Sequence, residues 1–203
     1  MNNDISTFDT LVDELAEQGW SAQKGFLTDE LTHALAAECL LRAQQGDLRP
    51  AAIGRAQDKQ IREGIRGDLI EWVEPDQSPC VTRYLEILEA LKQTLNRQLY
   101  LGLEDFEGHF ALYPAGAFYA AHLDRFKSDD KRMISTVLYL NQAWQAQEGG
   151  QLRLHLEPPV DIQPEGGTLA IFRSADILHE VLPASRERMS LVGWFRRRAD
   201  VPL

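Results

Sequence analysis

The stretch Tyr119-Ala-Ala-His122-Leu-Asp124 decides how the rest of this chain is interpreted. Alternate side chains of an extended strand point to the same face, so residues 122 and 124 can reach one ion together. Imidazole and carboxylate groups both bind transition metals. His-x-Asp also occurs by chance in many chains, and the alternative for this motif alone is an ordinary hydrogen-bonded strand histidine.

A second histidine and a basic residue follow in an order that fits a metal centre. His179 lies 55 residues after Asp124, and Arg188 lies nine residues beyond His179. Two imidazoles and one carboxylate can cover one face of an octahedral iron and leave the other face open, as in non-haem Fe(II) oxygenases. The pattern therefore predicts His122, Asp124 and His179 as metal ligands with catalytic roles.

Composition limits the classes of protein that this chain can represent. It has 203 residues, 44% of them hydrophobic and 26% charged, which is typical of one soluble globular domain. The net charge of −10 argues against a nucleic-acid partner. Cys39 and Cys80 lack metal-ligand spacing, and no apolar run suits a signal peptide or a membrane span. We expect a cytoplasmic, monomeric protein with no membrane partner.

The first half of the chain is predicted to be mainly helical. Apolar spacing indicates helices at 7–18, from Thr28 to about Gln45, and at 81–98. Residues 46–68 are rich in Gly, Arg, Gln and Asp, and we interpret them as a flap that closes over substrate, with a solvated linker as the alternative. Residues 1–100 would then form a helical buttress and a substrate flap.

From Gly108 onward the pattern changes to the period of two that is typical of strands. Turns containing Pro or Gly separate the predicted strands, which are 108–113, 117–124, 132–141, 151–156, 168–173, 177–182 and 188–197. This arrangement predicts an α+β, mainly β fold in a single domain. Its core, residues 101–203, would be a double-stranded β-helix, or jelly roll, that carries the metal site.

Several separate motifs make the chain similar to the 2-oxoglutarate- and Fe(II)-dependent oxygenases. More narrowly, it resembles the peptidyl-prolyl 4-hydroxylases of the hypoxia-inducible-factor type and their bacterial relatives, over about residues 60–197. The matching runs are Ile65-Arg-Gly-Asp-Leu-Ile-Glu-Trp-Val-Glu74, Tyr113-Pro-Ala-Gly, Tyr119-Ala-Ala-His122-Leu-Asp124, Tyr139-Leu-Asn141…Trp144…Gly149-Gly150-Gln-Leu152-Arg, and His179-Glu-Val-Leu-Pro183…Arg188…Trp194-Phe195.

The resemblance implies roles for four residues at the co-substrate. Arg188 would bind the C5 carboxylate of 2-oxoglutarate through two hydrogen bonds, which suits a planar guanidinium. Tyr139 would donate its hydroxyl to the same carboxylate. Tyr113 would lie near the iron and the other end of the co-substrate, and Leu152 would wall the site. The alternative for Tyr139 and Leu152 is a plain core position.

The resemblance also implies a substrate side. Tyr119 and Trp194 would line the pocket for a prolyl ring, although Trp194 could also be an ordinary core residue. Arg66 and Asp68 belong to the same side, and a salt bridge between them would close the loop. The chain departs from the family pattern in residues 46–64 and at Val192, where the family often has threonine.

The implied reaction is hydroxylation of a prolyl C4 atom with Fe(II), 2-oxoglutarate and O2, giving succinate and CO2, with ascorbate as a supporting reductant. The partner would be an intracellular protein bearing a target proline, with elongation factor Tu as the first candidate. The alternatives are hydroxylation of free proline or another small molecule, and a non-catalytic jelly-roll module that keeps a metal for structure. A nucleic-acid demethylase fits the acidic charge least well.

Overall fold

The computed structural model describes residues 3–51, 65–124 and 131–198. Three α-helices and short strands fill its first half, where Thr28 caps α2 and Gly46 ends it in a left-handed conformation. The helices are α1 (Asn3–Gln18), α2 (Asp29–Gln45) and α3 (Pro79–Leu99), and the strands are β1 (Trp20–Gln23), β2 (Arg49–Pro50) and β3 (Leu69–Trp72). All three predicted helices are confirmed.

The second half is built from strands, as the period of two predicts. The elements are β4 (Leu103–Tyr113), β5 (Tyr119–His122), β6 (Arg132–Tyr139), the 3-10 helix η2 (Ala146–Glu148), β7 (Leu152–Leu154), β8 (Val160–Ile162), β9 (Leu169–Arg173), β10 (His179–Val181) and β11 (Arg188–Arg197). All seven strands predicted from Gly108 onward are present. The short strands β2 and β8 were not predicted, and neither was the first half of β4.

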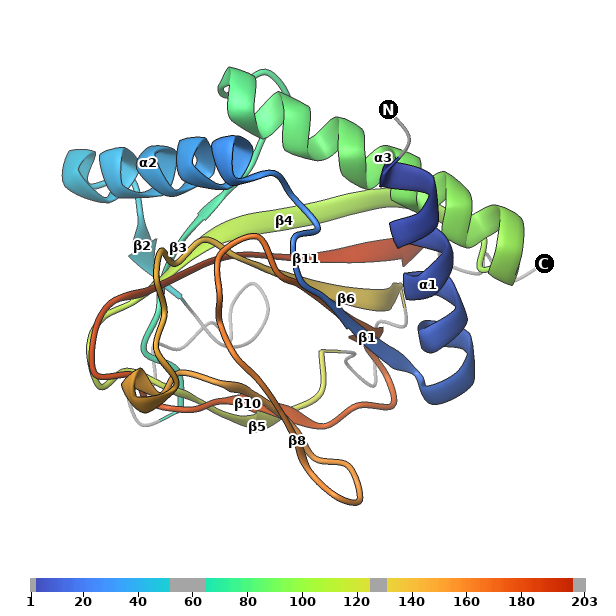
Figure 1. Ribbon diagram of the computed structural model, residues 1–203. Helices are drawn as coiled ribbons and strands as arrows, with labels where there is room; N and C mark the ends of the chain where they lie inside the picture. Colours follow the sequence, from blue (N-terminus) through green and yellow to red (C-terminus); the bar gives the residue numbers. More distant parts are fainter. Residues whose placement is uncertain (1–2, 52–64, 125–130, 199–203) are drawn as a thin grey trace.

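The strands form two sheets whose described pairings are all antiparallel. The larger sheet has the order β1-β9-β6-β11-β4-β3-β2, and the smaller has the order β5-β10-β7-β8. Figure 1 shows the smaller sheet below the larger one, and the helices above the larger sheet. The protein is therefore mainly β with antiparallel sheets, and strands of the N-terminal half complete the larger sheet.

Alternation along the central strands divides the core into two layers. Phe110, Leu138 and Ile171 pack with the helices, whereas their neighbours Ala111, Tyr139 and Phe172 face the smaller sheet. Alternate residues of a strand face opposite sides, so one sheet can carry both layers. The layer between the sheets contains the aromatic and polar side chains that form the candidate site.

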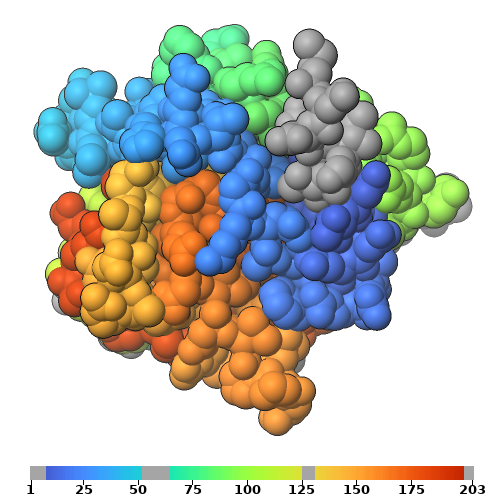
Figure 2. Space-filling view, viewed as in Figure 1, coloured from blue at the N-terminus to red at the C-terminus, as the bar shows by residue number. Residues whose placement is uncertain are grey.

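The surface shows how the two halves join. In Figure 2 the blue segment that leads into α2 lies against the orange segment around residue 165. The amide of Leu27 donates to the carbonyl of Gly167, and Lys24 pairs with Glu165 at 2.8 Å.

No described helix is long and apolar enough to cross a membrane. Most of the predicted flap, residues 52–64, lies outside the described residues.

Candidate active site

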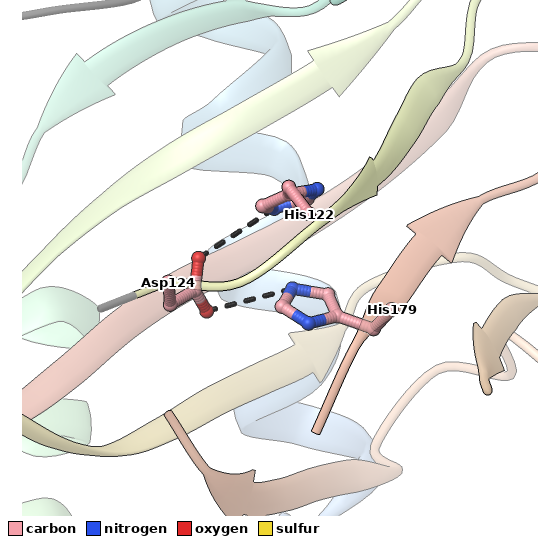
Figure 3. A group of neighbouring side chains, drawn as sticks. All are labelled: His122, Asp124 and His179. Carbon is pink, nitrogen blue, oxygen red and sulfur yellow. Dashed lines mark ion pairs between the residues drawn. The ribbon is translucent and has the colours of Figure 1, made fainter. Parts of the chain in front are cut away.

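The three predicted ligands meet between the two sheets. His122 ends β5 and His179 begins β10, and the two residues are direct partners across the smaller sheet. Asp124 follows His122 by two residues, and the ligand atoms of all three lie within 4.8 Å of one another. The Nε2 atom of His122 is 3.6 Å from one oxygen of Asp124, and that of His179 is 3.5 Å from the other (Figure 3).

Backbone carbonyls set the orientation of both imidazoles. The Nδ1 atom of His122 lies 2.8 Å from the carbonyl of Ala120, and that of His179 lies 3.0 Å from the carbonyl of Ile177. A carbonyl oxygen can only accept, so each Nδ1 carries a hydrogen and each Nε2, which faces Asp124, is the atom free to bind a metal. A metal-binding histidine is commonly oriented by such a hydrogen bond from its other ring nitrogen.

The carboxylate of Asp124 remains ionised although it is buried. Burial by itself would raise its pKa, but the imidazoles of His179 and His122 and the hydroxyl of Ser135 stabilise the charged form and hold the pKa well below its ordinary value. Burial lowers the pKa of His179, while the nearby Asp124 carboxylate opposes that shift. The cluster therefore offers two imidazole nitrogens and one anionic oxygen, a donor set suited to Fe(II).

A buried guanidinium lies in the same cavity, and no carboxylate in the described part of the chain pairs with it. Arg188 is 1% exposed, and it donates to the carbonyl of Gly150 at 2.8 Å and weakly to Ser190 at 3.4 Å. Among the described residues, neither its Nη2 atom nor the hydroxyl of Tyr139 has a hydrogen-bond partner. Burial raises the pKa of Tyr139 to about 12, so the hydroxyl remains a donor. These unused donors fit the carboxylate of a ligand.

A second arginine in the cavity is fully paired. Arg66 donates to both oxygens of Asp68 at 2.6 and 2.8 Å. Its guanidinium lies 4.7 Å from the ring centroid of Tyr119, and that ring stacks on His122 with centroids 3.7 Å apart. The structure thus brings the predicted substrate-side residues Arg66, Asp68 and Tyr119 together beside a metal ligand.

One cavity of about 540 Å³ joins these groups. Of the predicted residues, all except Tyr139 and Asp68 line it directly, and both lie just behind its wall, bonded to or packed against lining arginines. The predicted residues that line it are Arg66, Tyr113, Tyr119, His122, Asp124, Leu152, His179, Arg188 and Trp194. Val192, the position of the departure noted above, lines the cavity too.

Some residues at the site were not predicted from the sequence. His109 is buried, and its ring lies 5.2 Å from that of Trp72 and 5.7 Å from that of Trp194. Alternation places it on the same face of β4 as Tyr113, and that signal could have identified it. Ser135 was missed as well, since only the pairing of distant strands brings it to Asp124.

Comparison with known proteins decides the family. The model of the 2OG-Fe(II) oxygenase superfamily matches residues 108–196. A crystal structure of a Pseudomonas putida prolyl-4-hydroxylase superimposes with a TM-score of 0.87 and 51% identity, covering 95% of this chain and 100% of that one. The chain belongs to the 2OG-Fe(II) oxygenase superfamily. Membership implies Fe(II), 2-oxoglutarate and O2, which the donor set and the unpaired guanidinium fit.

Further relatives of this oxygenase are animal proteins. Egl nine homolog 1 of Homo sapiens is 32% identical over 163 residues, which is 72% of this chain and 38% of that protein. The oxygenase thus spans about two-fifths of the length of that relative. A Trichoplax adhaerens prolyl hydroxylase, solved with a peptide fragment of hypoxia inducible factor, has a TM-score of 0.84 and 27% identity, covering 93% of this chain and 88% of that one.

Proposed function

We propose that this oxygenase is a peptidyl-prolyl 4-hydroxylase. It would hydroxylate the C4 atom of a prolyl residue in an intracellular protein, with His122, Asp124 and His179 as the iron ligands. The observation that carries the proposal is one continuous cavity that joins an unpaired buried guanidinium, a three-ligand cluster and an aromatic wall. The likeness to prolyl hydroxylases of Pseudomonas putida and Trichoplax adhaerens supports the choice of proline.

The residues divide the work of binding the co-substrate. Arg188 and Tyr139 hold the C5 carboxylate of 2-oxoglutarate, while Tyr113 and Leu152 wall the space between that carboxylate and the ligands. When bound, Fe(II) supplies the oxygen chemistry in which 2-oxoglutarate, O2 and a prolyl C–H bond give succinate, CO2 and a prolyl C–OH bond. The cavity wall orients the ring and excludes water from the reacting atoms.

The other part of the cavity suits a peptide better than a free amino acid. Its wall includes Trp72, which is 44% exposed, so the aromatic surface reaches solvent. The guanidinium of Arg132 lies 3.5 Å from the centroid of the Trp194 ring and pairs with Glu107 at 2.8 Å. A site for free proline needs no such extension, whereas a polypeptide must leave the pocket on both sides of its prolyl ring.

The remaining features of the proposal concern the partner and the setting. We propose elongation factor Tu as the first substrate to test, with ascorbate as a supporting reductant. The enzyme would act in the cytoplasm as a monomer, and the two free cysteines suit a reducing compartment. Its fold would be a double-stranded β-helix that the N-terminal helices buttress, since α1, α2 and α3 share a core with the larger sheet.

The first experiment is anaerobic reconstitution with Fe(II) and 2-oxoglutarate. We expect a weak visible metal-to-ligand absorption band that disappears when oxygen and substrate are admitted. Mass spectrometry should then find one added oxygen atom on a prolyl peptide, first with purified elongation factor Tu and then with a cell lysate. Absence of the band would contradict the oxygenase assignment and favour a non-catalytic metal-binding module.

Variants of the ligands test the metal centre itself. His122→Ala and Asp124→Ala should abolish substrate-dependent succinate formation while far-ultraviolet circular dichroism stays that of the wild type, because each removes one of three ligands. Retained activity in both variants would show that the three-residue cluster takes no part in the reaction.

The substrate class is tested with the wild type. If it turns over free proline but no peptide, the small-molecule alternative is correct.

A further inference from the structure

Asp124 differs from the other two ligands in how the fold holds it. His122 and His179 lie in paired strands, and each is oriented by a backbone carbonyl nearby in its own chain segment. Asp124 lies beyond the end of β5, directly before residues 125–130, which are outside the described part of the chain. Its carboxylate is therefore oriented by something other than strand pairing.

That orientation comes from the larger sheet. The hydroxyl of Ser135 in β6 donates to Oδ2 of Asp124 at 2.7 Å, and both residues are buried. An ionised carboxylate only accepts hydrogen bonds, so the single hydroxyl hydrogen of Ser135 points to it. A hydrogen bond to a charged acceptor is shorter and stronger than one between neutral groups.

A second serine fixes the first. The Oγ atoms of Ser174 and Ser135 lie 2.9 Å apart. Because Ser135 gives its hydrogen to Asp124, the hydroxyl of Ser174 donates to Ser135. Ser174 is fully buried just after β9, and its amide donates to the carbonyl of Met133 at 3.0 Å. The direction of donation thus runs from Ser174 through Ser135 to Asp124.

We propose that Ser135, supported by Ser174, is a positioning residue of the metal centre. It holds the carboxylate of Asp124 in one orientation before the ion binds, with Oδ2 engaged and Oδ1 left for the ion. Groups that orient metal ligands commonly contribute a factor of 10–100 to metal affinity. This inference rests on the proposed function, since it concerns how the same three residues bind their ion.

The test is the affinity of the metal-free protein for Mn(II), which binds oxygen ligands and needs no protection from air. Electron paramagnetic resonance reports the free ion during a titration. Ser135→Ala should raise the Kd for Mn(II) about 10–100-fold. Ser174→Ala leaves the direct bond in place but loosens it, and should raise the Kd about 2–10-fold. Thermal unfolding of each metal-free variant shows whether it remains folded.

Thr136→Ala is the matched control. Thr136 is the next residue of β6, is equally buried and also donates its hydroxyl, to the carbonyl of Gly193 at 3.2 Å. It lies on the opposite face of the strand, away from the ligands. This variant should bind Mn(II) as the wild type does. Equal weakening in Thr136→Ala and Ser135→Ala would mean that loss of packing explains both, and would overturn the proposal.

The outcomes separate the inference from the function on which it rests. If the wild type fails to bind Mn(II), the proposed metal centre itself is wrong. If the wild type binds Mn(II) and Ser135→Ala binds it equally well, the metal centre stands and the positioning role is wrong. If Ser135→Ala does not fold, Ser174→Ala decides, because an unchanged Kd there contradicts the directed pair of serines.

Discussion

Arg66 and Arg188 lie in the wall of the same cavity, but their guanidinium groups have different kinds of described partner. The side chain of Arg66 is paired through two hydrogen bonds with Asp68, whose own side chain is 0% exposed. Arg188 is more deeply buried, and among the described residues it bonds only to a carbonyl and a hydroxyl. A buried guanidinium without an anion is costly, so the two arginines imply different sources of negative charge.

The difference separates a contribution to folding from a contribution to binding. The carboxylate for Arg66 comes from its own chain two residues away, and that pair is complete in the folded protein. No described residue supplies a carboxylate to Arg188, and in the proposed function the co-substrate supplies it. His109 shows a third solution, because its ring avoids charge altogether. Burial and the nearby Arg66 lower the pKa of His109 to about 4.

Breaking the ion pair between Arg66 and Asp68 should have the largest effect on the free energy of unfolding. Asp68→Ala leaves Arg66 buried without its partner, and we expect the free energy of unfolding to fall by about 3–5 kcal/mol. Urea denaturation measures the loss. The affinity for 2-oxoglutarate should change little in the variant that remains folded at low urea. A loss of co-substrate affinity equal to that in Arg188 variants would mean that the two arginines form one network.

The buried ring of His109 predicts that the free energy of unfolding depends on pH. The unfolded chain binds a proton at His109 below pH 6.5, whereas the folded protein does so only below about pH 4. The folded state is therefore penalised as pH falls from 6.5 to 4, by on the order of 3 kcal/mol. His109→Gln should lack this component. Urea denaturation of both proteins across that range measures the difference, and parallel curves would show that folding does not lower the pKa of His109.

Arg188→Met should produce the opposite of the Asp68 result. Replacing an unpaired buried cation with an apolar side chain of similar length should leave the stability of the ligand-free protein unchanged or higher. Loss of a charge-assisted contact should weaken 2-oxoglutarate binding by about 1.5–3 kcal/mol, or about 10–150-fold. Anaerobic calorimetry on the Mn(II)-loaded protein measures this Kd. An unchanged Kd would assign the carboxylate to another residue.

Tyr139→Phe sharpens the same comparison with a smaller change. It removes one neutral hydrogen-bond donor to the ligand carboxylate. The binding free energy of 2-oxoglutarate should weaken by about 0.5–1.5 kcal/mol, which raises the Kd about 2–12-fold. Tyr84→Phe is the matched control. Its hydroxyl is also buried without a partner among the described residues, but it belongs to the layer beneath the helices. Similar effects in both variants would mean that packing, and not the ligand, responds.

The sequence predicted most of the fold and the central cluster, and physical reasons explain the rest. Strand alternation identifies which residues share a face, so His122 and Asp124 could be paired from spacing alone. It does not determine which strands become neighbours, and the contact between Ser135 and Asp124 depends on that choice. Very short strands such as β2 and β8 carry too few residues for a period to be recognised.

The direct pairing of His122 with His179 has a mechanical consequence. A slip of one residue between β5 and β10 would turn one imidazole to the outer face of the smaller sheet. The pairing already contains one register shift, between His179 and Val181. An ion bound by both rings would link β5 to β10, two strands that are distant in sequence, and would stabilise their register. Loading the metal should therefore slow hydrogen exchange at the amides of β5 and β10, which makes the cofactor part of the scaffold.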